Sequence, residues 1–257
     1  MVLILITLLL SSGQPRLVGI MGAMDVEVAL IREEMKVEQV DTISRRIFTI
    51  GKLNNIPCVC VKAGIGKVNA ALTAEILIRE YGVDAIIFTG VAGGINPQLN
   101  IGDIVIAERV LHHDYGQITP TTFMPWDTVG FVADSFLVSI TAQAAKNVMF
   151  DSIPQKIRKK AANFPRITIG RVTTGDQFIA SEEKREWIEK TFRAECVEME
   201  GAAVAQVCFI NNVPFVIIRS LSDLANEEAD IDFEAFVRYA AKNSSLIVTE
   251  IMKLIAK

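Results

Sequence analysis

The sequence predicts an α/β fold in which helices cover a central sheet. Short apolar runs bounded by turn residues recur along the chain, and stretches with helical spacing separate many of them. Several of these helical stretches begin at an Asp or Ser residue, which is suited to cap a helix. The chain has 257 residues with 51% hydrophobic content, and no linker-like or strongly charged block divides it after residue 15. We therefore expect a single domain over residues 15–257.

In the N-terminal half of the chain, each expected strand is an apolar run that stops near a glycine or a charged residue. These runs are residues 17–21, 46–51, 57–62, 85–90 and 103–111. The expected helices are residues 25–35, which begin with Asp25, and residues 67–81, which follow a glycine turn. Residues 112–130 include two prolines and have no clear period. A connection of that length often lines or covers a site.

The same alternation continues in the C-terminal half. The expected strands are residues 167–174, 194–198 and 214–221. The expected helices are residues 133–149, 181–192, 201–211 and 232–256, of which two begin at Ser181 and Asp232. The sheet is thus expected to be central and mostly covered by helices.

The N-terminal segment, residues 1–14, has a different composition. Its first ten residues are almost wholly apolar and lead into Ser11-Ser12-Gly13, as in the apolar part of a signal peptide, but no Lys or Arg precedes them. The run is shorter than the roughly 20 residues of a membrane-spanning helix. It is interpreted as a weak export signal, a segment upstream of the true start, or an accessory segment. The expected location is cytoplasmic, with export or the cell surface as the alternative.

Net charge and cysteine spacing exclude several classes of function. The net charge of −4 gives no general attraction to nucleic acid, so a small-molecule substrate is expected. The four cysteines lack a C-x-x-C spacing and are expected to be buried, reduced thiols: Cys58, Cys60, Cys196 and Cys208. The adjacent His112 and His113 have no further Cys or His cluster near them, so no metal is expected.

Three carboxylates follow three expected strands. Glu27 comes after residues 17–21 and a short turn, Glu200 after residues 194–198, and Asp223 after residues 214–221. Open α/β sheets bind their ligands at such strand ends. The sequence therefore predicts acid/base chemistry at this edge of the sheet.

Two glycine turns also follow strands, at residues 64–66 and 90–94. Each allows a ligand to approach the backbone closely, although turn geometry alone would explain either one. Neither turn matches the G-x-G-x-x-G fingerprint or a P-loop, so no nucleotide cofactor is expected.

Six motifs occur in a distinctive order. They are Gly-Ala-Met-Asp-Val-Glu at 22–27, Gly-Ile-Gly-Lys at 64–67, Thr-Gly-Val-Ala-Gly-Gly at 89–94, Gly-Asp-Gln-Phe-Ile at 175–179, Val-Glu-Met-Glu at 197–200 and Arg-Ser-Leu-Ser-Asp at 219–223. With these motifs the chain resembles the 5′-methylthioadenosine/S-adenosylhomocysteine nucleosidase family, from about residue 17 to its C-terminus. The resemblance implies a three-layer α/β/α sandwich of the nucleoside phosphorylase superfamily with a central mixed, twisted sheet. It also implies a homodimer that hydrolyses the N-glycosidic bond of 5′-thioadenosines without metal or cofactor.

The resemblance implies catalytic roles for two carboxylates. Asp223 would protonate adenine at N7, held by Ser222, and burial would have to raise its pKa from the ordinary value of about 3.9. Glu27 would take a proton from the attacking water. The structural alternatives are a helix N-cap for Asp223 and a solvated first-turn glutamate for Glu27.

The resemblance also implies a set of substrate contacts. Glu200 would bind the ribose hydroxyls, with Met199 against the sugar, while Glu198 alternates to the other face of its strand and is not expected in the site. Phe178 would stack on adenine, with an ordinary core phenylalanine as the alternative. The remaining expected substrate-binding residues are Met24, Ile65, Ala92, Gly93, Ile179, Arg219 and Phe233.

One departure from the family pattern and two rival functions remain open. Val91 occupies a position where the family commonly has a hydroxyl residue. Either turnover is reduced, or backbone groups of Ala92 and Gly93 take over the hydrogen bond. A nucleoside phosphorylase of the same fold is the alternative enzyme, but the turn at 22–27 has two acids where a phosphorylase has an arginine. An exported polyanion-binding protein is the other alternative, through the basic side chains of Lys156, Arg158, Lys159 and Lys160.

Overall fold

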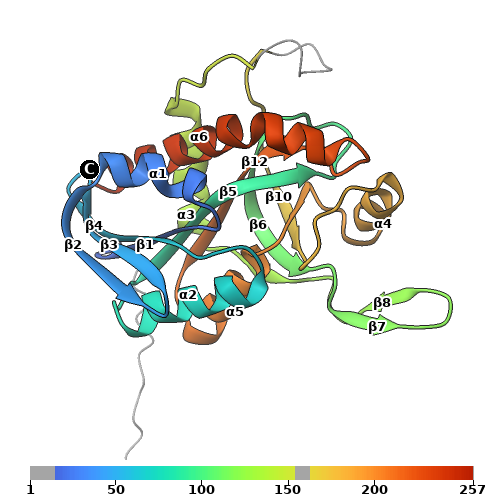
Figure 1. Cartoon of the computed structure of the whole chain (residues 1–257), viewed down its shortest axis with the longest axis horizontal. Coiled ribbons are helices and arrows are strands. Elements are labelled where there is room, and N and C mark those ends of the chain that lie inside the picture. Colours follow the sequence, from blue (N-terminus) through green and yellow to red (C-terminus); the bar gives the residue numbers. More distant parts are fainter. Residues whose placement is uncertain (1–14, 154–162, 257) are drawn as a thin grey trace, which may run out of the picture.

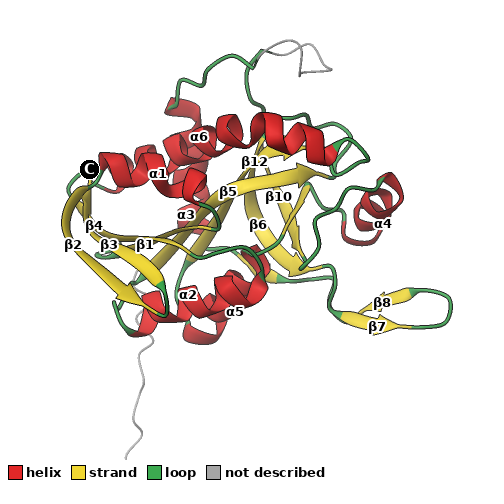
Figure 2. Cartoon of the chain, viewed as in Figure 1, coloured by secondary structure: helices red, strands yellow, loops and turns green. Residues whose placement is uncertain are grey.

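The computed structural model describes residues 15–153 and 163–256, and they form a mixed sheet between two layers of helices (Figures 1 and 2). The strands are β1 (Val18–Gly22), β2 (Lys36–Ile43), β3 (Arg46–Leu53), β4 (Ile56–Lys62), β5 (Ala85–Gly94), β6 (Ile104–His112), β7 (Gly116–Ile118), β8 (Phe123–Pro125), β9 (Phe131–Val132), β10 (Ile167–Thr174), β11 (Cys196–Glu198) and β12 (Phe215–Asp223). The helices are α1 (Asp25–Glu34), α2 (Lys67–Arg79), α3 (Ser135–Asn147), α4 (Glu182–Phe192), α5 (Gly201–Asn211) and α6 (Ala229–Ile255).

The main sheet has the order β11-β10-β6-β12-β5-β1-β4-β3-β2, with β9 paired to β6. β1 runs parallel to β4 and β5, and β5 runs parallel to β12, whereas β12 and β6 are antiparallel. β11 pairs with both β10 and β5, so the strands from β10 to β5 close into a ring through β11. The predicted α/β/α sandwich with a mixed sheet is thus confirmed.

The core has one large cluster on each face of the sheet. Apolar side chains of α1, α3 and α6 pack on one face, and those of α2 and α5 pack on the other. β5 and β12 are buried almost throughout because helices cover both of their faces, which explains their continuous apolar runs. A smaller cluster joins α4 to the ends of β6 and β11.

Four strands were not expected from the sequence. β2 is exposed along most of its length at one edge of the sheet, so it has no buried face to produce an apolar alternation. β7 and β8 form a separate two-stranded hairpin, and β9 follows it. In Figure 1 the hairpin projects away from the body of the molecule. None of residues 112–130 lines the cavity described below, so within one chain this segment does not line the site, and its role as a cover stays a prediction.

The cysteines agree with the sequence-based prediction. All four thiols are free and buried, and Cys58 and Cys60 lie on one face of β4 in the cluster beneath α6. Burial raises the pKa of Cys58, Cys60 and Cys208 to about 12, so these thiols stay protonated and unreactive.

Two predictions lie outside the described residues. They are the export or start-site interpretation of residues 1–14 and the polyanion site at Lys156, Arg158, Lys159 and Lys160. Within the described parts of the chain, none of the helices has the length and apolar character needed to cross a bilayer.

Candidate active site

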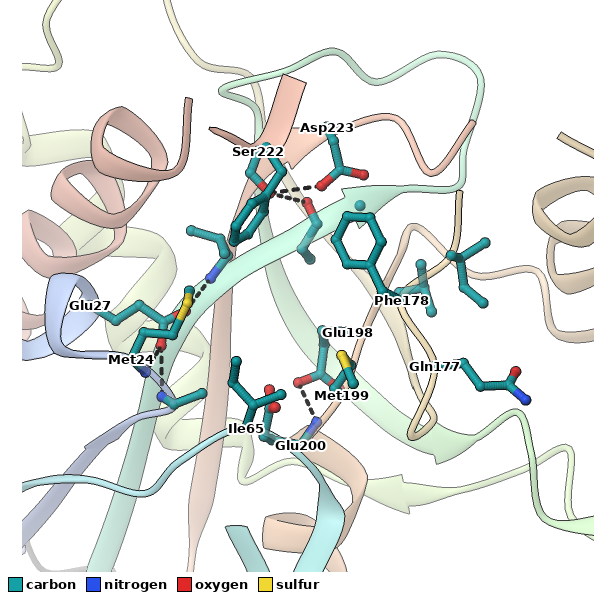
Figure 3. Close-up of a pocket in the computed structure, with 17 residues that line it drawn as sticks. Met24, Glu27, Ile65, Gln177, Phe178, Glu198, Met199, Glu200, Ser222 and Asp223 are labelled. Atoms are coloured by element: carbon teal, nitrogen blue, oxygen red, sulfur yellow. Dashed lines mark hydrogen bonds between the residues drawn. The ribbon is translucent and has the colours of Figure 1, made fainter. Parts of the chain in front are cut away.

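One cavity lies where the carboxyl ends of β1, β5, β11 and β12 meet (Figure 3). Twelve of the thirteen site residues predicted from the sequence line it, namely Met24, Glu27, Ile65, Ala92, Gly93, Phe178, Ile179, Met199, Glu200, Ser222, Asp223 and Phe233. The thirteenth, Arg219, is buried outside this lining. The strand ends therefore bring together residues from the whole length of the described chain.

A bulge in β12 directs two neighbouring side chains into the cavity. β12 pairs with β5 in register as far as Leu221, and the pairing resumes with Asp223 opposite Gly93. Neighbours in a regular strand point to opposite faces, but the extra residue, Ser222, changes the direction of the chain here. Ser222 and Asp223 consequently both face the cavity.

The Asp223 carboxyl is buried and held at both oxygens. Ser222 Oγ donates to Oδ2 at 2.9 Å, and the backbone N–H of Ala225 donates to Oδ1 at 2.9 Å. Burial raises the pKa of Asp223 to about 6, although both hydrogen bonds oppose the rise. The N-cap interpretation of Asp223 is wrong, because this residue ends β12 and α6 begins only at Ala229. A carboxyl with this pKa is suited to donate a proton near neutral pH.

The Glu27 carboxylate lies in the first turn of α1 and is only 3% exposed, so the solvated alternative is wrong. Its Oε2 accepts hydrogen bonds from the backbone N–H groups of Ala23 at 2.6 Å and Met24 at 2.8 Å. Its Oε1 accepts one from Val91 at 3.0 Å. Burial raises the pKa of Glu27, while Arg219 and these N–H groups oppose the rise. Glu27 is thus a fixed hydrogen-bond acceptor in a dry site.

Glycines allow the two acids to approach the backbone of β5. A Cβ added at Gly90 would lie 2.6 Å from Glu27 Oε1, and one added at Gly93 would lie 2.7 Å from Asp223 Oδ1. Both distances are too short for a real side chain, so any other residue would displace the neighbouring carboxylate.

Glu200 is the N-cap residue of α5 and lines the cavity beside Ile65 (Figure 3). Its Oε1 accepts a hydrogen bond from the backbone N–H of Gly66 at 2.8 Å. Burial, and after it the negative charge of Glu198, raises the pKa of Glu200. The turn at 64–66 therefore positions a carboxylate as well as lining the cavity.

The prediction that Glu198 lies on the opposite face is wrong. Strand alternation ends at this residue, because β11 stops there and the chain turns through Met199 into α5. Glu198 lines the same cavity as Glu200 and is buried. Its carboxylate accepts from the backbone N–H groups of Glu200 and Gly201 and from the Thr174 hydroxyl.

Arg219 is the counter-ion of Glu198. Its Nη2 lies 2.6 Å from Glu198 Oε2, and both side chains are at most 2% exposed. Its Nη1 donates to the Ile218 carbonyl at 3.0 Å, and the guanidinium lies 4.2 Å above the Phe88 ring. Arg219 was expected among the substrate-binding residues, but its guanidinium pairs with a carboxylate and does not line the cavity. The sequence signal that could have indicated a buried acid such as Glu198 is an arginine in an otherwise apolar strand, because a buried arginine needs a counter-ion.

The opposite wall of the cavity is mainly apolar. Phe178 is 44% exposed and meets Phe233 edge to face, with ring centroids 5.7 Å apart, so it is not a core phenylalanine. Ile179 also lines the cavity, Met199 lies beside Glu198 and Glu200 (Figure 3), and Gln177, which was not predicted, adds an amide. An aromatic edge beside a buried acid suits a flat heterocycle that accepts a proton.

Comparisons with known proteins agree with this geometry. The family model described as the phosphorylase superfamily matches residues 17–253. The 5′-methylthioadenosine/S-adenosylhomocysteine nucleosidase of Tolumonas auensis is 37% identical over 243 residues, which cover 92% of this chain and 98% of that protein. The chain belongs to this nucleosidase family. It is accordingly an enzyme of the N-glycosyl hydrolase class.

Two solved structures of family members resemble it closely. The nucleosidase from Neisseria meningitidis in complex with methylthio-immucillin-A has a TM-score of 0.81 and 36% identity, and the match covers 93% of this chain and 99% of that one. The nucleosidase from Colwellia psychrerythraea in complex with adenine has a TM-score of 0.80 and 35% identity, with 93% and 96% covered.

Val91 contributes to this nucleosidase through its backbone. Its side chain lines the cavity, and its N–H donates to Glu27. The replacement of a hydroxyl by backbone groups of Ala92 and Gly93 stays a prediction. The Ala92 carbonyl instead accepts from Ser222 Oγ at 3.4 Å.

The histidine pair lies beside the nucleosidase cavity and outside its lining. Burial lowers the pKa of His113 to about 4, so this ring is neutral, and it packs so tightly on Gly175 that no Cβ would fit there. In the described residues, no group of three or more His, Cys, Asp or Glu side chains is arranged to hold a metal ion.

Proposed function

We propose that the protein hydrolyses the N-glycosidic bond of 5′-methylthioadenosine and S-adenosylhomocysteine and releases adenine and the 5′-thioribose product. The observation that carries this proposal is the convergence of Glu27, Glu200 and Asp223 on one largely apolar cavity. The activity of the relatives and the ligands of the two similar structures support the choice of substrate.

Asp223 is the proposed general acid. Adenine is a poor leaving group as an anion, so protonation at N7 must accompany cleavage of the bond. Asp223 faces the apolar wall that contains Phe178, and its pKa of about 6 leaves part of the population protonated near neutral pH. Ser222 keeps the carboxyl in one orientation while the proton is transferred.

Glu27 and Glu200 are proposed to act on the sugar side. Glu27, held by three backbone N–H groups, would take the proton of the attacking water. Glu200, held by Gly66, would bind the ribose hydroxyls and stabilise the positive charge that develops at the sugar. The Glu198–Arg219 pair fixes the start of α5 and hence the position of Glu200.

Hydrolysis is preferred to phosphorolysis on electrostatic grounds. The residues that line the cavity in the described part of the chain include four carboxylates and neither lysine nor arginine. Phosphate would meet repulsion there, and Arg219 is already paired with Glu198. Water is the nucleophile that fits such a site.

A homodimer is part of this proposal. The β7–β8 hairpin carries the exposed side chains of Tyr115, Ile118, Met124 and Trp126. An isolated two-stranded hairpin is marginally stable in water, so an apolar projection of this kind requires a covering surface. A second copy of the chain is the proposed partner, and the molecular mass in solution tests this.

The test is adenine release from 5′-methylthioadenosine with and without phosphate, together with identification of the sugar product. We expect adenine to be released at the same rate with and without phosphate, and the sugar product to be a free thioribose. Formation of a sugar 1-phosphate would make the enzyme a phosphorylase. Absence of adenine under both conditions would overturn the proposed activity.

A further inference from the structure

A second cleft lies outside the active site, between α1, the turn that joins β2 to β3, and the end of β4. It has a volume of about 410 Å³ and is lined by Asp25, Arg32, Ser44, Arg45, Arg46, Ile47, Lys62, Ala63, Gly64 and Asn69. Four cationic side chains thus face one carboxylate. We call this the basic cleft.

The positive charge in the basic cleft is only partly neutralised. Lys62 Nζ lies 2.6 Å from Asp25 Oδ2, and Arg32 Nη1 lies 3.5 Å from Asp25 Oδ1, so two cations share one carboxylate. The Nε of Arg32 is buried and has no hydrogen-bond partner among the described residues. A buried donor of this kind is costly unless a ligand or water satisfies it.

Arg46 is held in place by neutral groups. Its Nε, Nη1 and Nη2 donate to the Ala63 carbonyl at 3.1 Å, the Ser44 carbonyl at 2.8 Å and Asn69 Oδ1 at 2.7 Å. These bonds fix the guanidinium without cancelling its charge. The cleft is therefore preorganised for an anion.

Arg45 has a free side chain at the mouth of the cleft. It is exposed, has a φ of 63°, and forms no ion pair with any described residue. Its charge is thus available to a ligand.

We propose that the basic cleft binds a phosphoryl group, either as inorganic phosphate or as the phosphate of a small metabolite. Arginine guanidinium groups match phosphate oxygens with two parallel hydrogen bonds, and this cleft offers three arginines and a lysine. The net charge of the whole chain, −4, disfavours a long polyanion, so a small ligand fits better.

The basic cleft is separate from the active site but adjoins it. The two cavities share no lining residue, yet Asp25 and Glu27 are two positions apart, and Gly64 precedes Ile65. Asn69 accepts from Arg46 and donates through Nδ2 to the Ile65 carbonyl at 2.7 Å. Phosphate in the cleft therefore lies one hydrogen-bonded side chain away from the wall of the active site.

The test is a calorimetric titration of the full-length protein with inorganic phosphate at constant ionic strength. We expect saturable binding of one phosphate per chain. Arg45→Glu should weaken it roughly tenfold or more, and Arg45→Gln by less. Arg193→Glu is the matched control, because Arg193 is also an exposed arginine with positive φ (53°) and lies at the end of α4, far from β2 and β3 in Figure 1.

Absence of saturable binding, or equal affinity in wild type and Arg45→Glu, would overturn the proposal. So would displacement of phosphate by adenine, because that result would place the anion in the active site. The titration requires no turnover, so its result is independent of the proposed activity. If phosphate changes the rate of adenine release in wild type but not in Arg45→Glu, and the sugar product stays unphosphorylated, it acts from this cleft and not as the nucleophile.

Discussion

The active-site cavity and the basic cleft lie on either side of the first turn of α1, and their carboxylates behave in opposite ways. Burial raises the pKa of Glu27, whereas the hydrogen bond with Lys62 lowers the pKa of Asp25, two residues earlier. Glu27 is 3% exposed, and the Asp25 side chain is 68% exposed. Both acids have a shifted pKa, but burial dominates at Glu27 and the hydrogen bond with a lysine dominates at the exposed Asp25, so the two shifts have opposite signs.

The same contrast applies to ion pairs. The Arg219–Glu198 and Lys62–Asp25 pairs each have an N–O distance of 2.6 Å, but only the first is buried. A buried charge depends on its partner because water cannot replace it, whereas exposed charges remain solvated when separated. Equal distances therefore correspond to very different energies.

The largest effect is expected from Asp223→Asn. Loss of the proposed acid should reduce the rate of adenine release by about a hundredfold to ten-thousandfold, since general acid catalysis contributes on that scale. Phosphate affinity in the basic cleft should not change. Glu234→Gln, at an exposed acid of α6 that does not contribute to the raised pKa of Asp223, is the control and should keep the rate near wild type. A near-normal rate in Asp223→Asn would remove this residue from its role.

Glu198→Gln should destabilise the fold by about 3–5 kcal/mol, because it leaves the Arg219 charge buried without a counter-ion. Urea unfolding monitored by circular dichroism measures this loss. A change below about 1 kcal/mol would show that the buried pair contributes no more than an exposed one.

The pH dependence of stability should reveal Asp223. Its folded pKa of about 6 exceeds the ordinary value of 3.8, so between these values the folded state binds the proton more strongly than the unfolded state. The free energy of unfolding should therefore fall as the pH rises from about 4 to about 6, by up to about 3 kcal/mol. Asp223→Asn should remove this fall and be more stable than wild type at pH 7. If the free energy of unfolding depended on pH in the same way in wild type and in Asp223→Asn, the raised pKa of Asp223 would be contradicted.

The smallest effect is expected from Lys62→Gln. This change breaks an ion pair with the same 2.6 Å distance as the buried one, but it should cost less than about 1 kcal/mol because both groups are exposed. Urea unfolding of Lys62→Gln and Glu198→Gln under the same conditions compares the two losses of free energy of unfolding directly. If Lys62→Gln lost as much free energy of unfolding as Glu198→Gln, water would not solvate the Lys62 and Asp25 charges to the extent that their exposure indicates.

Much of the site could be predicted from the sequence because its residues follow strands. Carboxylates and glycines after apolar runs indicated an acid/base site, and twelve predicted residues surround one cavity. Glu198 was missed because strand alternation was extended past the point where β11 ends. Arg219 was expected to bind substrate, whereas it is the buried counter-ion of Glu198, because pairing between two strands cannot be read from one strand's own pattern.

The elements that the sequence did not predict are those without a buried face. β2 is exposed at an edge, and the β7–β8 hairpin projects from the body, so neither has the periodic apolar pattern on which prediction depends.

By itself the sequence determined the α/β class, the order of the main strands and helices along the chain, and the acids at the strand ends, because these depend on local periodicity and turn chemistry. Only the tertiary structure decided which face each acid occupies, that Glu198 pairs with Arg219, and that Arg32, Arg45, Arg46 and Lys62 surround one cleft. The physical reason is that burial and charge pairing depend on contacts between distant segments. The bulge at Ser222 and the closure of the sheet through β11 create those contacts at the active site.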